Sequence, residues 1–429
     1  MFKNKKTYLI PIIGFALIIL IGAVLLYLPI CNNNSISFKD AIFTSTSGVT
    51  TTGLTKVVLA EQFNFLGQLI LAILMEIGAM GFIIFISYFW VLKNKKMKMS
   101  DIMVINDSIS GESYGTIKEH TIFICKWMFR VQILGTLFLC FNFIPQYGVL
   151  KGIWYSIFHT ISAFSNCGFD LIGNNSLIPF KDNCYIQIIL SALMISGSVG
   201  ILVIEDIKNN KSKKFDRLML QTKIVLIFTL ILLLVPTVLI KILEPEASLL
   251  NSFFMSATSR STGFSVVNLE NLSQASKVIL IVTMFIGGGP TSTAGGVKII
   301  PIVVILATII GTLKGKNETV IFWRKIPESN VRKSFTILIL FLIVLSVIGM
   351  IMSSYNNLSV LEIVFNNVSA ISNTGLSLYD INELNIVQEI CTIVLMFIGR
   401  VGILSLILIF FNEDKKDKFI KHPTENVIL

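Results

Sequence analysis

Charged residues and residues that bind metals are scarce in this sequence. Of its 429 residues only 14% are Asp, Glu, Lys or Arg, whereas soluble proteins carry about 25%. Its three histidines lie far apart along the chain, and its six cysteines include no Cys-x-x-Cys pair. The first shortage argues against an ordinary soluble domain. The second leaves little support for a metal-binding cluster or a disulfide framework.

Apolar residues are abundant instead. They make up 54% of the chain, and the mean hydropathy is +0.79. Several apolar runs reach the roughly 20 residues that a helix needs to cross a bilayer. The net charge of +10 comes from Lys and Arg clustered between these runs, a pattern typical of cytoplasmic loops rather than of a nucleic-acid surface. The run at about 8–30 is longer than the core of a signal peptide, so we expect a retained membrane helix.

One short pattern occurs four times in the chain. Each copy has Phe ten positions before a glycine, Thr or Cys directly before that glycine, and Leu or Phe directly after it. The copies are Phe43–Leu54, Phe158–Phe169, Phe253–Phe264 and Phe365–Leu376. Repetition of this kind indicates that four short loops serve as one set.

Each copy includes or follows an apolar stretch too short to span a bilayer and lies between two longer apolar runs. A polar backbone at membrane depth must line a cavity or be buried in protein, so each short stretch is expected to be re-entrant. The sequence therefore predicts an all-α polytopic membrane protein. Its four fused helix–pore-loop–helix repeats, with eight spans and four re-entrant half-helices, would surround a central pore.

The predicted boundaries follow from these runs. We expect repeat 1 at 1–99 with its pore loop at 38–54, repeat 2 at 100–218 with 152–169, repeat 3 at 219–331 with 248–264, repeat 4 at 332–411 with 361–376, and a tail at 412–429. An even number of spans places both termini on one side. The basic clusters fall on that same side, which predicts cytoplasmic termini and a multi-pass protein of the cell membrane.

A bare cation can cross such a structure only where other oxygens replace its hydration shell. Rings of backbone carbonyls do this in potassium-selective pores. Directing consecutive carbonyls at one axis favours glycine, which tolerates positive φ, and neighbouring Thr or Ser adds hydroxyls without filling the hole. Four such loops would therefore form a cation filter.

The repeated loops resemble those of the Trk/Ktr/HKT superfamily of potassium transporters, most closely the Ktr-type membrane subunit, over residues 8–411. The resemblance implies that monovalent potassium is the metal ion carried. It also implies that the filter consists of four triplets: Thr51, Thr52 and Gly53; Asn166, Cys167 and Gly168; Ser261, Thr262 and Gly263; Asn373, Thr374 and Gly375. Cys167 departs from Thr in the other copies, and we expect a small effect because the backbone carbonyl is the ligand.

Glycine and proline interrupt the last apolar run of the third repeat. A stable helix in hydrocarbon is not expected there, so the segment should line a cavity. The resemblance implies an intramembrane gating loop at 287–298. Its predicted gate residues are Gly287, Gly288, Gly289, Pro290, Ser292, Thr293, Gly295, Gly296 and Lys298. Arg400, alone within the last span, is predicted to latch this loop; the alternative is an Arg that extends to the cytoplasmic interface.

Four further residues are candidates with alternatives. Glu76 could pair with Arg400 or Lys298, or could attract cations in the cytoplasmic vestibule. Asp170 could draw cations to the outer mouth or be a solvated turn residue. Arg260 is expected to brace the third loop, and His159 is expected to be structural.

What we expect of regulation and of partner proteins rests on the resemblance alone. It implies a homodimer on a cytoplasmic ring of nucleotide-binding regulatory subunits. This chain has no nucleotide-binding fingerprint, so we expect no organic cofactor, with sodium an open candidate as activator. Alternatives are a closed-site secondary cation symporter and a less selective sodium/potassium pathway. The lack of paired acids or metal ligands at depth argues against an enzyme.

Overall fold

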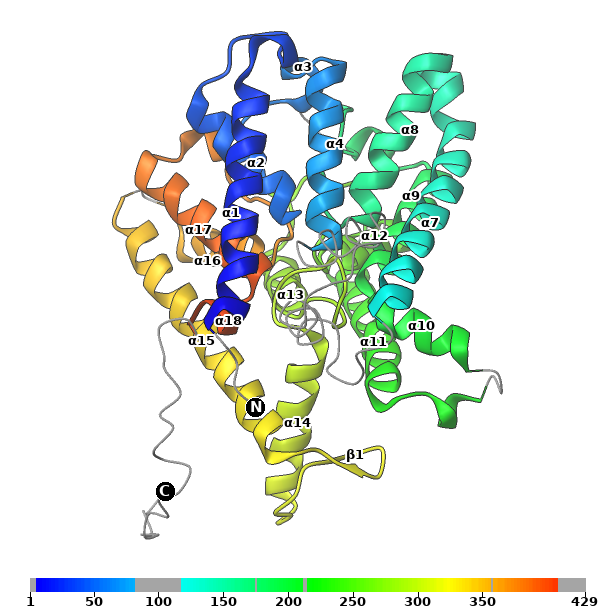
Figure 1. The fold of residues 1–429 in the computed structure, drawn as a ribbon, viewed down its shortest axis with the longest axis vertical. Coiled ribbons are helices and arrows are strands. Elements are labelled where there is room, and N and C mark those ends of the chain that lie inside the picture. The colour runs from blue at the N-terminus through cyan, green and yellow to red at the C-terminus, as the bar shows by residue number, and fades with distance from the viewer. Residues whose placement is uncertain (1–4, 82–116, 174–175, 211–213, 356–357, 408–429) are drawn as a thin grey trace.

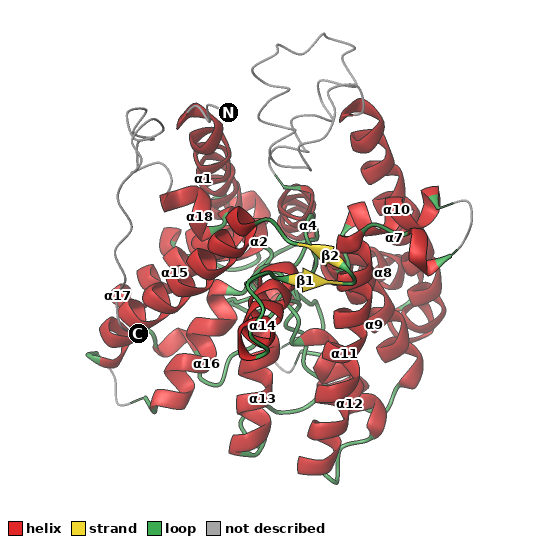
Figure 2. Ribbon diagram, turned by 90° about the horizontal axis from the view of Figure 1, so that it is seen from below, coloured by secondary structure: helices red, strands yellow, loops and turns green. Residues whose placement is uncertain are grey.

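The computed structural model describes residues 5–81, 117–173, 176–210, 214–355 and 358–407. These residues are mostly helical (Figures 1 and 2). The strands in the described part are β1 (Val320–Ile321) and β2 (Arg324–Lys325), which pair antiparallel. The predicted all-α architecture is therefore confirmed, with one short hairpin added at one end of the molecule.

The helices fall into four units in chain order. Unit 1 contains α1 (Lys5–Tyr27), α2 (Phe38–Thr50), α3 (Leu59–Gln62) and α4 (Phe65–Met80). Unit 2 contains α7 (Ile117–Tyr147), α8 (Val149–Phe164), α9 (Cys184–Ser198) and α10 (Ile201–Asn209). Unit 3 contains α11 (Leu220–Leu243), α12 (Leu249–Thr258), α13 (Gln274–Phe285) and α14 (Ile299–Leu313). Unit 4 contains α15 (Glu328–Ser353), α16 (Val360–Ile371), α17 (Ile386–Val401) and α18 (Ile403–Ile407).

The second helices of units 2 and 4 are broken, whereas the sequence predicted an interruption in unit 3 alone. Among the described residues, α1, α7, α11 and α15 are long and apolar enough to cross a membrane, and α9 with α10 would be a fifth span if counted together. The break between α9 and α10 bends the chain by 88° at Gly200, and α17 ends at Gly402. Both glycines have positive φ, at 96° and 89°, which ends a right-handed helix.

The half-helices α2, α8, α12 and α16 lie close to their predicted positions. Local capping explains three of their starts, because the side chains of Ser37, Ser248 and Ser359 each accept a backbone N–H in the first turn. Ser359 and Glu362 form a complete capping box. Each half-helix packs against the long helix before it, as α1 with α2 and α7 with α8 do.

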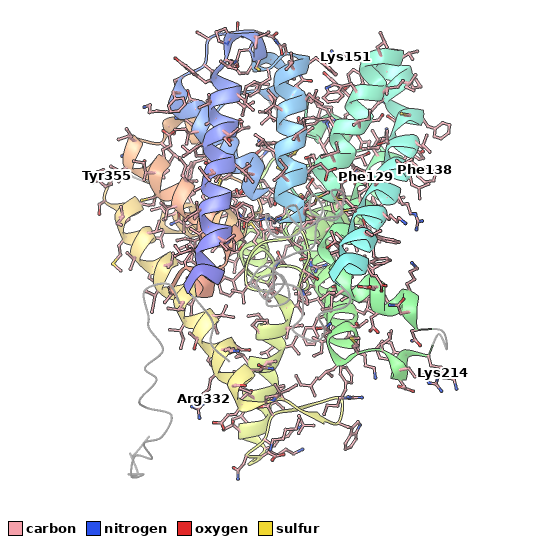
Figure 3. The ribbon with its side chains drawn as sticks, in the orientation of Figure 1. Phe129, Phe138, Lys151, Lys214, Arg332 and Tyr355 are labelled. Atoms are coloured by element: carbon pink, nitrogen blue, oxygen red, sulfur yellow. The ribbon has the colours of Figure 1, made fainter. Side chains whose placement is uncertain are left out.

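The outer surface of the long helices is apolar. Leu17, Leu137 and Leu234 are 50–56% exposed, as expected for side chains that face lipid. Phe129 and Phe138 project from α7 in the same manner (Figure 3). Lys214 and Arg332 lie at one end of the molecule and Lys151 lies at the other (Figure 3). The apolar band therefore separates two polar ends.

Candidate functional site

The four repeated loops have the same backbone conformation. Each begins where a half-helix ends, and in each the glycine has positive φ, at 91°, 80°, 93° and 87° in chain order. The residue two positions earlier also has positive φ, at 54° for Thr51, 55° for Asn166, 98° for Ser261 and 50° for Asn373. Positive φ is uncommon outside glycine. Its recurrence at these positions shows that the four loops are built alike.

The loops pack against one another as a closed ring. A methyl group placed on Gly53 would lie 2.0 Å from the carbonyl oxygen of Cys167, and one on Gly168 would lie 2.0 Å from that of Thr262. The contacts continue from Gly263 to Thr374 at 2.1 Å and from Gly375 back to Thr52 at 2.0 Å. Each glycine thus meets the carbonyl of the next unit, and the fourth returns to the first.

We call this arrangement the filter ring. It consists of residues 51–53, 166–168, 261–263 and 373–375, and the side chains of its eight non-glycine residues are at most 1% exposed. The C-terminal ends of the four half-helices lead directly into it. Since helix C-termini carry partial negative charge, these ends favour a cation at the centre of the ring.

Beside the filter ring, the chain between α13 and α14 forms the intramembrane loop, residues 286–298. Its two ends are held together, because Gly287 N donates to Val297 O at 2.9 Å and Ile299 N donates to Gly288 O at 3.1 Å. The loop then packs on unit 2, where Gly289 N donates to Ser198 O at 2.9 Å. Gly288 and Gly289 let its backbone approach that of unit 2 closely, because an added Cβ would lie 2.5 Å from Ser198 O and 2.2 Å from Val199 O.

Two cationic side chains hold the intramembrane loop. The guanidinium of Arg400 donates to the carbonyl of Thr293 in the loop and to the carbonyl of Gly78 in unit 1. The ammonium of Lys298 folds back on the loop and donates to the carbonyl of Ala294. The ion pairs between described residues involve neither cation. Arg400 therefore joins three units through carbonyl groups.

Glu76 forms no ion pair with these cations among the described residues. Its carboxyl group lies near the side chain of Gln132 in α7. The predicted pairing with Arg400 or Lys298 is therefore not present in the described part of the chain.

Two other candidates, Arg260 and His159, are buried. Arg260 is 1% exposed, and its Nη2 is 3.5 Å from Thr229 Oγ1 on α11. His159 Nδ1 is 2.7 Å from the carbonyl oxygen of Tyr155, and its Nε2 accepts the N–H of Leu171 at 3.3 Å. This pattern fits a neutral imidazole that braces the chain after the second filter loop.

Asp170 turns toward its own loop. Its Oδ1 accepts the N–H of Ile172 at 3.0 Å, so this side of the carboxylate is used by the backbone that follows the second filter loop. The geometry matches a turn residue in the chain just after the second filter loop.

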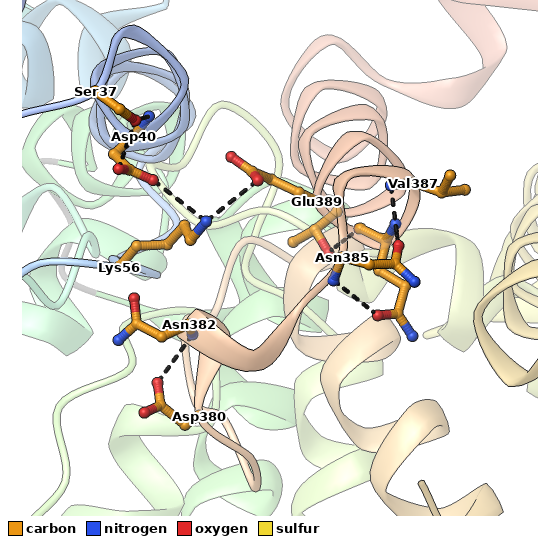
Figure 4. A network of polar contacts seen from close by, with 10 residues as sticks. Ser37, Asp40, Lys56, Asp380, Asn382, Asn385, Val387 and Glu389 are labelled. Carbon is orange, nitrogen blue, oxygen red and sulfur yellow. Dashed lines mark hydrogen bonds and ion pairs between the residues drawn. The ribbon is translucent and has the colours of Figure 1, made fainter. Parts of the chain in front are cut away.

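A charged cluster links units 1 and 4 near the filter ring. The ammonium of Lys56, three residues after Gly53, lies 3.2 Å from Asp40 Oδ1 and 3.2 Å from Glu389 Oε2 (Figure 4). Burial lowers the pKa of Lys56, but hydrogen bonds and attraction from Glu389 and Asp40 outweigh it, so the pKa is above its usual value. The cluster fastens the loop after the first filter triplet to α17.

A second set of repeated glycines was missed in the sequence. Methyl groups on Gly78, Gly197 and Gly399 would lie 2.0–2.2 Å from the carbonyl oxygens that end the half-helices of their own units. In unit 3 the counterpart Gly287 would instead meet the carbonyl of Gly295, at 1.9 Å. The available signal was a Met three residues before each glycine, at 75, 194, 284 and 396.

The sequence matches a known protein family and is similar to several of its relatives. The family model described as TrkH, cation transport protein, matches residues 3–422. The chain is 33% identical to the potassium/sodium uptake protein NtpJ of Enterococcus hirae, over 97% of this chain and 95% of that protein. It is 32% identical to the Ktr system potassium uptake protein B of Bacillus subtilis, with the same coverage.

A solved structure has a similar fold. The crystal structure of the potassium transporter TrkH from Vibrio parahaemolyticus matches with a TM-score of 0.77 at 19% sequence identity. The match covers 95% of this chain and 85% of that one. At this identity the likeness concerns the fold, and the expectation of four helix–loop–helix units is in keeping with it.

Proposed function

The chain belongs to the TrkH family of cation transport proteins, and from that premise we propose that it takes up potassium through the filter ring. Proteins of this family transport ions and are not enzymes, which agrees with the sequence-based expectation. Relatives about 30% identical are named as potassium uptake proteins. Potassium is thus the cargo, and the chain is a cation uptake transporter of the Ktr/Trk type in a cell membrane.

The observation that carries this proposal is the closure of the ring. Each filter glycine packs so closely on the next unit that an added Cβ would lie 2.0–2.1 Å from a carbonyl oxygen there, and these four contacts run once around all four units. A ring of this kind brings four sets of backbone oxygens around one axis, and such oxygens can replace the water around potassium. Glycine is required at each contact, because any side chain there would overlap a backbone oxygen of the next unit.

We assign the gate to the intramembrane loop and Arg400. Charge-assisted hydrogen bonds from Arg400 to carbonyls contribute about 1.5–3 kcal/mol each, enough to hold a short loop closed. The positive charge of Arg400 and of Lys298 also opposes a cation on the path. Opening then requires that the loop leave the carbonyls and hydroxyls that hold it.

Partners and orientation belong to the same proposal. Relatives are named as parts of a Ktr system, which favours a membrane subunit that works with a second protein. We assign a homodimer on a cytoplasmic ring of nucleotide-binding subunits, with both termini cytoplasmic. Sodium would act, if at all, as an activator, and no organic cofactor would bind this chain.

A second candidate is a less selective pathway for sodium and potassium. The name of the NtpJ relative, a potassium/sodium uptake protein, favours it. Glycine in all four filter loops instead resembles the potassium-selecting members of the superfamily. The ratio of the two fluxes separates these candidates.

The test is cation flux into liposomes that contain the purified full-length protein, under gradients of potassium, rubidium, sodium or lithium. We expect potassium and rubidium flux well above sodium flux in the wild type and a lower ratio in Gly263→Ser. Gly349→Ser is the matched control, because the nearest side-chain atom to its added group is 3.9 Å away and its φ is not positive. The absence of electrogenic flux, even after removal of part of the intramembrane loop, would favour a closed-site symporter instead.

A further inference from the structure

We propose that the inner edge of the filter ring and the intramembrane loop form one hydrogen-bonded unit, in which Ser261 and Asn166 position both parts. On this proposal, which rests on the proposed function, the state of the gate changes the selectivity of the filter. Both residues lie two positions before a filter glycine, have positive φ, and are at most 1% exposed.

Ser261 connects three segments through one hydroxyl group. Its Oγ accepts the N–H of Gly295 in the intramembrane loop at 2.8 Å. The same Oγ lies 3.1 Å from the carbonyl oxygen of Ser372 and 3.0 Å from that of Asn373, so its proton can be donated to either. Asn373 belongs to the filter ring of unit 4. The hydroxyl of Ser261 therefore lies between the gate and a filter carbonyl.

Asn166 makes a second connection between the intramembrane loop and the filter ring. Its amide lies 2.5 Å from Thr293 Oγ1 in the loop and 2.6 Å from Thr262 Oγ1 in the filter ring. Turning the amide over keeps both contacts and adds the carbonyl of Met194 as an acceptor at 3.2 Å. Either orientation thus joins the loop to the filter triplet of unit 3.

Asn373 completes the contact from unit 4. Its Nδ2 donates to Thr52 Oγ1 and to the carbonyl of Met396, both at 2.9 Å. A methyl group placed on Gly295 would lie 2.3 Å from Asn373 Oδ1, so the loop backbone fills the space beside this side chain. The equivalent residue of unit 1, Thr51, has no hydrogen-bond partner for its Oγ1 among the described residues.

Movement of the loop is expected to change the inner edge of the ring, because Ser261 and Asn166 form hydrogen bonds with both. When the loop moves away, Ser261 loses a donor and Asn166 loses a hydroxyl partner, and buried polar groups then seek new partners. The carbonyls of unit 4 and the hydroxyl of Thr262 are next to them, so the inner edge of the ring changes with the gate. By reciprocity, an ion that fixes the ring also favours one position of the loop.

The intramembrane loop can be shortened with little disturbance of its ends. A methyl group on Gly287 would lie 3.4 Å from Gly296 Cα, so removal of residues 288–295 joins two residues that already lie close together. The shortened chain provides an open background in which Gly295 and Thr293 are absent. Effects that pass through these two residues must disappear there.

The experiment measures the rubidium uptake rate and the rubidium-to-sodium flux ratio in liposomes for Ser261→Ala in both backgrounds. In the full chain we expect Ser261→Ala to raise the rate by about fivefold, in line with the loss of one hydrogen bond, and to lower the ratio. In the shortened chain its effect on the rate should be much smaller, because the N–H of Gly295 that Ser261 accepts is absent. Equal effects in both backgrounds would overturn the proposal, because contacting residues that are coupled give non-additive changes.

Two further variants keep the test decisive. Thr293→Val removes the hydroxyl that contacts Asn166 without altering any filter residue, and we expect it to lower the flux ratio; a faster rate at an unchanged ratio would contradict the proposal. Ser256→Ala is the matched control, since Ser256 is buried on α12 and donates to Leu233 O, away from the loop. Absence of flux in every chain, including the shortened one, would instead contradict the proposed function.

Discussion

The filter ring and the intramembrane loop are built on opposite plans. The ring repeats one contact four times, with each glycine against the next unit's carbonyl. The loop occurs in unit 3 alone among the described residues, where Gly287 meets Gly295 instead of the end of its own half-helix. Surrounding an ion requires equivalent oxygens on all sides, whereas closing a path requires one segment that can move.

The two regions are also held by different forces. Close backbone packing at four glycines holds the ring, and side-chain hydrogen bonds such as that from Thr262 to Asn166 add to it at the inner edge. Side-chain hydrogen bonds from Arg400, Ser261 and Asn166 hold the loop. Removing one such bond costs about 0.5–3 kcal/mol, so substitutions should shift the loop gradually and damage the ring abruptly.

The largest effects are expected at the ring. Gly53→Ala, Gly168→Ala and Gly375→Ala each place a methyl group 2.0 Å from a carbonyl oxygen at positive φ. Backbone strain of this kind costs about 1–3 kcal/mol before the overlap is counted. We expect the potassium-to-sodium flux ratio to fall by about tenfold or more at every position. A position at which alanine leaves the ratio unchanged would show that the four contacts are not equivalent.

A smaller effect is expected at the gate, where the rate of uptake should rise. Arg400→Gln replaces two charge-assisted hydrogen bonds with weaker neutral ones, so rubidium uptake into liposomes should rise by about tenfold. Arg332→Gln is the control, because Arg332 is exposed and pairs with Glu328 within α15. Slower uptake in Arg400→Gln than in Arg332→Gln would contradict the assignment of the gate.

The sequence predicted the repeated parts better than the unique ones. The four half-helices and filter loops could be located because their residues recur at fixed spacing, and each depends on a local feature such as glycine or a serine cap. The contacts of Glu76 and Ser261 could not be predicted, since they depend on which units are neighbours. The breaks at Gly200 and Gly402 were not predicted, because apolar residues continue on both sides of each glycine and resemble one uninterrupted span.

Two glycines at helix ends differ in whether they contact the intramembrane loop. A methyl group on Gly200 would lie 2.3 Å from the carbonyl oxygen of Pro290 in the intramembrane loop, whereas one on Gly81 meets no described atom within 4 Å. Both glycines have positive φ, so alanine strains each by about 1–2 kcal/mol. We expect Gly200→Ala to change rubidium uptake about threefold and Gly81→Ala to leave it unchanged. Equal changes in the two variants would mean that the break itself, rather than the loop, sets the rate.

The smallest effect is expected at the charged cluster between units 1 and 4. Lys56→Gln removes two ion pairs that are partly buried, with an expected cost of about 1 kcal/mol. Thermal unfolding of the detergent-solubilised protein should show a slightly lower Tm. Glu389→Gln alone and combined with Lys56→Gln gives a double-mutant cycle, and strict additivity would show that the pair contributes nothing.

The most direct test of the account compares the full chain with the chain that lacks residues 288–295. Both are measured in liposomes under opposed potassium and sodium gradients. The account predicts that the shortened chain conducts faster and still prefers potassium, because the filter ring remains, but with a lower preference than the full chain. Equal rates in the two chains, or a shortened chain with no preference for potassium, would contradict it.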